Sequence, residues 1–211
     1  PGAFELAREM GADAAELDVR DAADGSLVVR HDALPASAEG QRDLPRLPEV
    51  LDACDGLLVN VEIKNLEGDV DFAATVEFVD RVLEELTGRG DPGRWVISSF
   101  SRATIDHCRV RVPEIATAFL VDDPVCADLG DIAAAGHAAL HPDVRYVDAA
   151  LVERCHAVGL AVNTWTCNDP ERIAELDGLG VDGVCTDVPD VALAALGRSG
   201  PLTPRRWGRP G

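Results

Sequence analysis

Short segments rich in β-branched residues alternate with amphipathic helical stretches along almost the whole chain, and this order constrains the fold most. Strands are predicted at residues 15–19, 27–29, 58–64, 95–100, 116–121, 138–140, 160–165 and 181–187. Helices are predicted at residues 4–10, 47–54, 70–86, 103–109, 149–158, 170–176 and from 191 onward. Such alternation is typical of a parallel sheet covered by helices. The sequence therefore predicts one α/β domain over residues 1–197, followed by a disordered Gly-, Pro- and Arg-rich tail over residues 198–211.

The excess of acidic over basic side chains disfavours some classes of binding partner. The 211 residues carry 38 acidic and 19 basic side chains, a net charge of −19. Nucleic acid and anionic membranes are therefore unfavourable partners, and an anionic substrate would need a local cation. No apolar run is long enough for a transmembrane helix. Six cysteines without a CxxC pair favour free thiols and the cytoplasm, while a sequence that begins at Pro1 leaves a cleaved signal peptide as the alternative.

One connection is too short for a crossover helix. Only twelve residues separate Asp18 from His31, whereas a helical crossover needs about a dozen residues beyond the strands. Asp24-Gly25 is a strong two-residue hairpin signal. A hairpin with that turn would place Asp18 opposite His31, and Glu16 would share a face with Asp18 because side chains alternate along a strand.

Three carboxylates occupy strand positions that would normally be apolar: Glu16, Asp18 and Glu62. Carboxylates held close together either share a proton or bind a cation. Their hard oxygen atoms suit Mg²⁺ or Ca²⁺. The alternative is that one or more of them faces solvent.

Four further residues are candidates for chemistry. His31 ends an apolar run and is a candidate general acid or base, or an ordinary hydrogen-bonded loop residue. Lys64 is the only lysine of the chain and is either functional or a solvated strand end. Trp165 ends an apolar strand and would line a pocket or belong to the core. His141, at the end of a short strand, is a weaker candidate.

These residues stand in motifs that resemble the signature of glycerophosphodiester phosphodiesterases. The matching segments, in order, are GADAAELDV (11–19), DG (24–25), VVRHD (28–32), LPEVL (47–51), VEIK (61–64), SSF (98–100), WTCND (165–169), GVDG (180–183) and TDVP (186–189). The resemblance implies a TIM (β/α)8 barrel that hydrolyses glycerophosphodiesters to glycerol 3-phosphate and an alcohol. It also implies a small anionic phosphodiester as the substrate.

The resemblance also assigns roles to individual residues. Glu16, Asp18 and Glu62 would bind a divalent metal, Mg²⁺ or Ca²⁺, and His31 would be one of two acid–base histidines. Lys64 would contact the phosphate, and Trp165 would line the pocket. A bound metal neutralises phosphate charge, and a histidine pair can accept one proton and donate another to the leaving alcohol.

The sequence departs from the family at its start. Family members begin with a strand ending in His-Arg-Gly, followed by a Pro-Glu-Asn-Thr segment, and neither occurs in this chain. The expected fold is therefore the barrel without its first strand, with two open sheet edges that favour a homo-oligomer. Because the other catalytic histidine is absent, we expect little or no activity. The alternatives are a non-catalytic metal-binding barrel and a phospholipase D-like relative acting on intact lipids.

Overall fold

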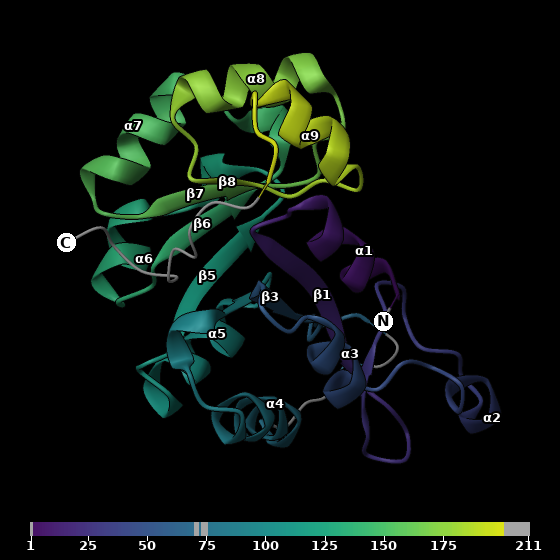
Figure 1. The fold of residues 1–211 in the computed structure, drawn as a ribbon. Helices are drawn as coiled ribbons and strands as arrows, with labels where there is room; N and C mark the ends of the chain where they lie inside the picture. The colour runs from purple at the N-terminus through teal and green to yellow at the C-terminus, as the bar shows by residue number, and fades with distance from the viewer. Residues whose placement is uncertain (1, 70–71, 73–75, 201–211) are drawn as a thin grey trace.

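The computed structural model describes residues 2–69, 72 and 76–200, and at its centre is a strongly curved sheet with helices on the outer face (Figure 1). The strands are β1 (Ala14–Asp21), β2 (Leu27–Val29), β3 (Leu58–Ile63), β4 (Trp95–Ser99), β5 (Ala116–Val121), β6 (Ala139–Pro142), β7 (Ala161–Thr164) and β8 (Gly183–Val184). Their order in the sheet is β2-β1-β3-β4-β5-β6-β7-β8. β2 pairs antiparallel with β1, and all other neighbours pair in parallel.

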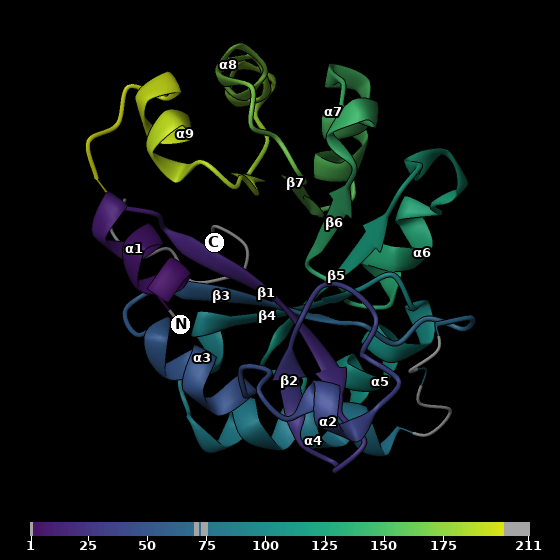
Figure 2. The ribbon, with the colours of Figure 1, turned by 90° about the vertical axis from the view of Figure 1, so that its right-hand side faces the viewer.

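Helices surround this sheet (Figure 2). They are α1 (Gly2–Met10), α2 (Ala38–Gln41), α3 (Leu47–Ala53), α4 (Glu77–Gly88), α5 (Arg102–Arg111), α6 (Leu129–Ala134), α7 (Ala149–Ala157), α8 (Pro170–Leu179) and α9 (Pro189–Ala195). The alternation confirms the predicted α/β barrel type of fold. Within the described residues the sheet is open, with β2 and β8 as its two edge strands, as expected for a barrel without its first strand.

The first and last helices meet beside this opening. α1 packs against α9, and the two lie next to each other in both views (Figures 1 and 2). The guanidinium of Arg198 also donates two hydrogen bonds of 2.7 Å to the carboxylate of Asp13, which precedes β1. These contacts connect the segment that precedes β1 with the segment that follows β8. Residues 201–211, which make up most of the predicted tail, lie outside the described residues.

The two faces of the sheet differ in chemistry because side chains alternate along each strand. On the outer face, Leu17, Val61 and Ile97 pack with Phe78 of α4 in the main apolar core. On the inner face, a small cluster of short side chains fills the barrel: Val96, Ala118 and Ala139, with Ala116 and Ala161 against them. This leaves the inner positions nearer the strand ends for the polar residues of the candidate site.

The β1–β2 hairpin corrects one sequence-based expectation. Asp18 does not pair with His31, because the backbone N–H of Arg30 donates to the Asp18 carbonyl at 2.9 Å. The turn has three residues rather than two: the N–H of Gly25 donates to the carbonyl of Ala22 at 2.8 Å, and Gly25 has a φ of 78°. Three-residue hairpin loops place glycine in this left-handed conformation. The extra loop residue shifts each partner on β2 by one position, so His31 follows the paired segment.

Some helix boundaries also differ from those predicted from the sequence. The helix predicted from residue 70 begins at Glu77, and residues 70–71 and 73–75 lie outside the described residues. The short helices α2 and α6 are not predicted by apolar spacing, although Ser37 and Asp128 cap their N-termini with side-chain oxygens. Within the described residues, no helix has both the length and the apolarity needed to cross a membrane.

Candidate active site

The three predicted carboxylates come together on the inner face of the barrel. Asp18 on β1 is the register partner of Glu62 on β3, and Glu16 lies two residues before Asp18 on the same face. One oxygen atom from each of the three carboxylates lies within 4.8 Å of the other two. Two local rules, alternation along a strand and register between parallel neighbours, are therefore sufficient to assemble the cluster.

The cluster carries unfavourable negative charge. Burial raises the pKa of Glu16 well above its usual value, and the neighbouring Asp18 and Glu62 raise it further. Burial also raises the pKa of Glu62, while Lys64 opposes that shift. The ammonium of Lys64 lies 2.9 Å from Asp18 Oδ1 and also contacts Glu62 Oε1. One lysine thus balances part of a charge that three buried carboxylates would carry when ionised.

The cluster fits a hard divalent cation. All of its ligand atoms are carboxylate oxygens, the type that Mg²⁺ and Ca²⁺ prefer. Glu16 Oε1 is buried and has no hydrogen-bond partner among the described residues. An unsatisfied buried carboxylate oxygen is unfavourable unless a cation or a donor meets it. Glu16, Asp18 and Glu62 are therefore suited to hold a divalent metal.

An aromatic wall stands beside the carboxylates. Phe100 follows β4 and Trp165 follows β7, and their rings meet edge to face with centroids 5.5 Å apart. The Lys64 ammonium lies 5.8 Å from the centroid of the Phe100 ring. The indole N–H of Trp165 donates to the carbonyl of His141 at 2.8 Å. The structure therefore connects Lys64 and Trp165 through Phe100. Phe100 belongs to the SSF motif (98–100), but the sequence does not predict it as a site residue.

His31 lies at the rim rather than inside the cluster. Its side chain is 77% exposed, and its Nδ1 lies 3.1 Å from Asp32 Oδ1. The buried guanidinium of Arg20 donates two hydrogen bonds to the His31 carbonyl, at 2.9 and 3.2 Å. Among the groups that affect the pKa of Glu62, which burial raises, His31 has a smaller lowering effect than Lys64. The hairpin therefore holds His31 near the carboxylates with its imidazole open to solvent.

A second histidine is buried in the barrel wall. His141 on β6 is 3% exposed, and its Nε2 accepts a hydrogen bond of 2.9 Å from the amide nitrogen of Asn163. Burial lowers the pKa of His141 from 6.5 to about 4. The imidazole is therefore neutral near pH 7 and acts there as a hydrogen-bond acceptor.

This burial predicts an acid-sensitive fold. Above about pH 6.5 His141 is neutral in the folded and the unfolded chain, but as the pH falls toward 4 only the unfolded chain takes up the proton. The free energy of unfolding should decrease over this range by up to roughly 3 kcal/mol. Urea unfolding at pH 7.5 and 4.5 measures the loss, which should be smaller in His141→Asn. Equal losses in the wild type and His141→Asn would contradict the prediction.

Comparisons with known proteins point to one family. The model of the glycerophosphoryl diester phosphodiesterase family matches residues 34–191. A glycerophosphodiester phosphodiesterase of Caldanaerobacter subterraneus is 25% identical over 222 residues, which cover 94% of this chain and 91% of the relative. One of Bacillus altitudinis is 27% identical, covering 90% of this chain and 89% of the relative.

Solved structures have the same fold. A putative glycerophosphoryl diester phosphodiesterase of Silicibacter pomeroyi superimposes with a TM-score of 0.78 at 28% identity, covering 94% of this chain and 88% of that one. A phosphodiesterase of Oleispira antarctica, solved with its product sn-glycerol-3-phosphate, has a TM-score of 0.78 at 24% identity. That match covers 92% of this chain and 89% of the other, and at this identity it supports the fold alone.

Proposed function

Because the chain belongs to the glycerophosphoryl diester phosphodiesterase family, we propose that it hydrolyses glycerophosphodiesters to glycerol 3-phosphate and an alcohol in a metal-dependent reaction. The observation that carries the proposal is the convergence of Glu16, Asp18 and Glu62 beside the single lysine of the chain. In a chain of net charge −19, Lys64 together with a divalent cation on the three carboxylates would supply the positive charge that an anionic phosphodiester needs.

The cation site consists of the three carboxylates. Glu16, Asp18 and Glu62 would hold Mg²⁺ or Ca²⁺ through oxygen atoms. A bound divalent cation supplies neutralisation of phosphate charge and activation of a coordinated hydroxyl or water. All other steps use side chains of the protein.

Two groups bind the substrate. The Lys64 ammonium can donate a charge-assisted hydrogen bond to a non-bridging phosphate oxygen, next to the carboxylates that it already contacts. Trp165, supported edge to face by Phe100, lines the adjacent space for the organic part of the substrate. The phosphate and the organic part of a small phosphodiester would thus contact separate side chains.

His31 is proposed as the acid–base residue. With its Nδ1–H donated to Asp32, the imidazole leaves Nε2 open to accept a proton and later to return it to the leaving alcohol. The hydrogen bond from His31 lowers the pKa of Asp32, which keeps that carboxylate ionised and able to orient the ring. Its exposure allows His31 to reach substrate at the rim.

The reaction is tested by release of glycerol 3-phosphate from glycerophosphocholine, with Mg²⁺, with Ca²⁺ and with a chelator. We expect release that requires the divalent cation and that falls to the background rate with the chelator. Intact phosphatidylcholine should release no glycerol 3-phosphate. Cleavage of the intact lipid alone would favour the phospholipase-like alternative.

The free cysteines support a location in a reducing compartment. Cys54, Cys108, Cys155, Cys167 and Cys185 form no disulfide among themselves. Burial raises the pKa of the Cys108 thiol to about 12, so this thiol stays protonated and unreactive. This pattern fits the cytoplasm, where the proposed substrate would be a small soluble phosphodiester.

A further inference from the structure

Several buried oxygen atoms in and beside the carboxylate cluster have no hydrogen-bond partner among residues 2–69, 72 and 76–200. Apart from Glu62 Oε1, which the Lys64 ammonium contacts, these atoms are Glu16 Oε1, Asn60 Oδ1 and Ser98 Oγ. Ser98 is 0% exposed. Buried polar atoms in folded proteins are nearly always hydrogen-bonded, to protein or to ordered water. Three such atoms in one region indicate that a further group meets them there.

The three atoms belong to adjacent strands and to one face of the sheet. Glu16 on β1 is the register partner of Asn60 on β3, and Glu62 on β3 is the partner of Ser98 on β4. Asn60 lies two residues before Glu62, so both point to the same side. The residues between them, such as Val61, pack in the helix-covered core. Asn60 and Ser98 therefore border the carboxylate cluster inside the barrel.

The chemistry of the three atoms indicates what meets them. A carboxylate oxygen and an amide oxygen only accept hydrogen bonds, whereas a hydroxyl can also donate one. The nearby ammonium of Lys64 is already engaged with Asp18 and Glu62. Water is small enough for a fully buried position and supplies donors, and divalent cations such as Mg²⁺ keep several water molecules when carboxylates bind them.

We propose that Asn60 and Ser98 bind the water molecules of the divalent cation held by Glu16, Asp18 and Glu62. This inference rests on the proposed function and adds two positioning residues to the cation site. Removal of a residue that hydrogen-bonds to a ligand of a bound metal typically weakens metal binding about 10- to 100-fold. Cation affinity, rather than the stability of the fold, should therefore depend on both residues.

Ser99 provides a matched control on the same strand. It is also 0% exposed, but its hydroxyl donates to the Ile63 carbonyl at 2.7 Å and accepts from the Ser101 N–H at 3.1 Å. Ser98→Ala removes an oxygen that has no partner among the described residues, so the metal-free protein should keep its melting temperature. Ser99→Ala removes two hydrogen bonds and should lower the melting temperature without changing cation affinity.

Isothermal titration of the full chain with MgCl₂, after removal of metal by a chelator, tests the inference without any activity assay. Ser98→Ala and Asn60→Leu should bind Mg²⁺ about 10- to 100-fold more weakly than the wild type. Asn60→Asp keeps an acceptor and should retain affinity. Circular dichroism checks whether each variant is folded. If Asn60→Leu does not fold, the Mg²⁺ affinity of Ser98→Ala alone tests the inference.

The outcomes separate this inference from the proposed function. Wild-type affinity in both Ser98→Ala and Asn60→Leu would overturn the inference and leave the phosphodiesterase proposal intact. An equal loss of melting temperature in Ser98→Ala and Ser99→Ala, without metal, would also overturn it, because Ser98 would then have a structural partner. A wild-type chain that binds neither Mg²⁺ nor Ca²⁺ would contradict both proposals.

Discussion

Replacement of Glu62 by glutamine is expected to abolish cation binding and, with it, hydrolysis. Glu62 is 7% exposed and is the register partner of Asp18. Glutamine keeps the shape but replaces the charged carboxylate oxygen by a neutral, more weakly binding amide oxygen. Loss of a residue that only hydrogen-bonds to a metal ligand typically lowers metal affinity or activity about 10- to 100-fold. Loss of a charged ligand itself should therefore lower Mg²⁺ affinity and kcat/KM at least about 100-fold.

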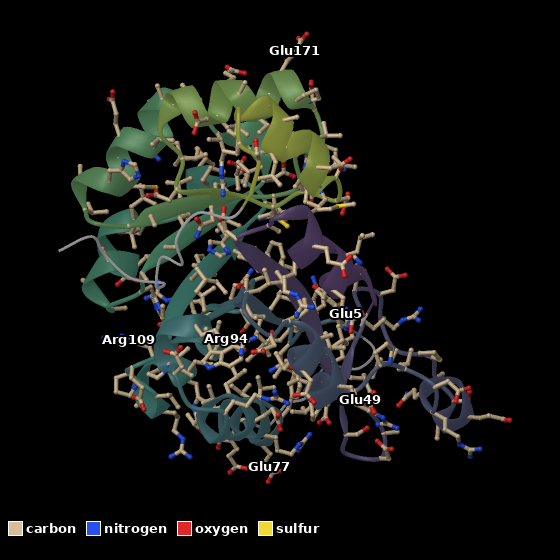
Figure 3. All side chains as sticks on the ribbon, in the orientation of Figure 1. Glu5, Glu49, Glu77, Arg94, Arg109 and Glu171 are labelled. Carbon is tan, nitrogen blue, oxygen red and sulfur yellow. The ribbon has the colours of Figure 1, made fainter. Side chains whose placement is uncertain are left out.

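The control for this change is Glu171→Gln, the same substitution on the outer surface of α8. Figure 3 shows Glu171 pointing away from the ribbon, far from the strands. Glu171→Gln should retain wild-type cation affinity and wild-type kcat/KM. A Glu62→Gln protein that is folded and binds Mg²⁺ as tightly as the wild type would show that the metal is held elsewhere.

Replacement of Lys64 by methionine is expected to separate substrate binding from cation binding. A hydrogen bond to a charged group contributes about 1.5–3 kcal/mol, so kcat/KM should fall about 10- to 100-fold. Mg²⁺ affinity should not fall, because the three carboxylates remain and the ammonium that contacts Asp18 and Glu62 is gone. Steady-state kinetics and calorimetry on the same preparation measure the two effects.

Lys64→Arg is the matched variant, since it keeps the positive charge with a different shape. It should restore part of the activity lost in Lys64→Met. A Lys64→Met protein that loses Mg²⁺ binding would contradict the proposed role, because it would make the lysine a support for the cation site instead of a phosphate ligand.

The convergence of the carboxylates could be predicted because it depends on local rules. Glu16 and Asp18 share a face through strand alternation, and parallel pairing brings Glu62 beside them. The position of His31 could not be predicted as well. Asp24-Gly25 is compatible with both two- and three-residue hairpin loops. One additional loop residue shifts the register, so that every residue of β1 pairs with a different residue of β2.

Other features of the site depend on contacts between distant strands. Phe100 gains its place beside Trp165 only when β4 and β7 curve toward one another, which no local pattern specifies. Ser98 and Ser99 are identical in sequence terms, and only the pairing of Ser98 with Glu62 shows which one faces the carboxylates. The short helix α6 did leave a signal, because Asp128 caps it and Gly136, with a φ of 87°, follows its end.

We propose that a cation held by Glu16, Asp18 and Glu62 enables this chain to hydrolyse a glycerophosphodiester. Phosphorus NMR of one sample of glycerophosphocholine and the 211-residue chain tests it directly, first with chelator and then with excess Mg²⁺ or Ca²⁺. We expect the diester signal to persist with chelator and to be replaced by the signal of glycerol 3-phosphate after metal is added. A parallel sample of Glu62→Gln should stay unchanged. Conversion with chelator present, or equal conversion by Glu62→Gln, would contradict the proposal.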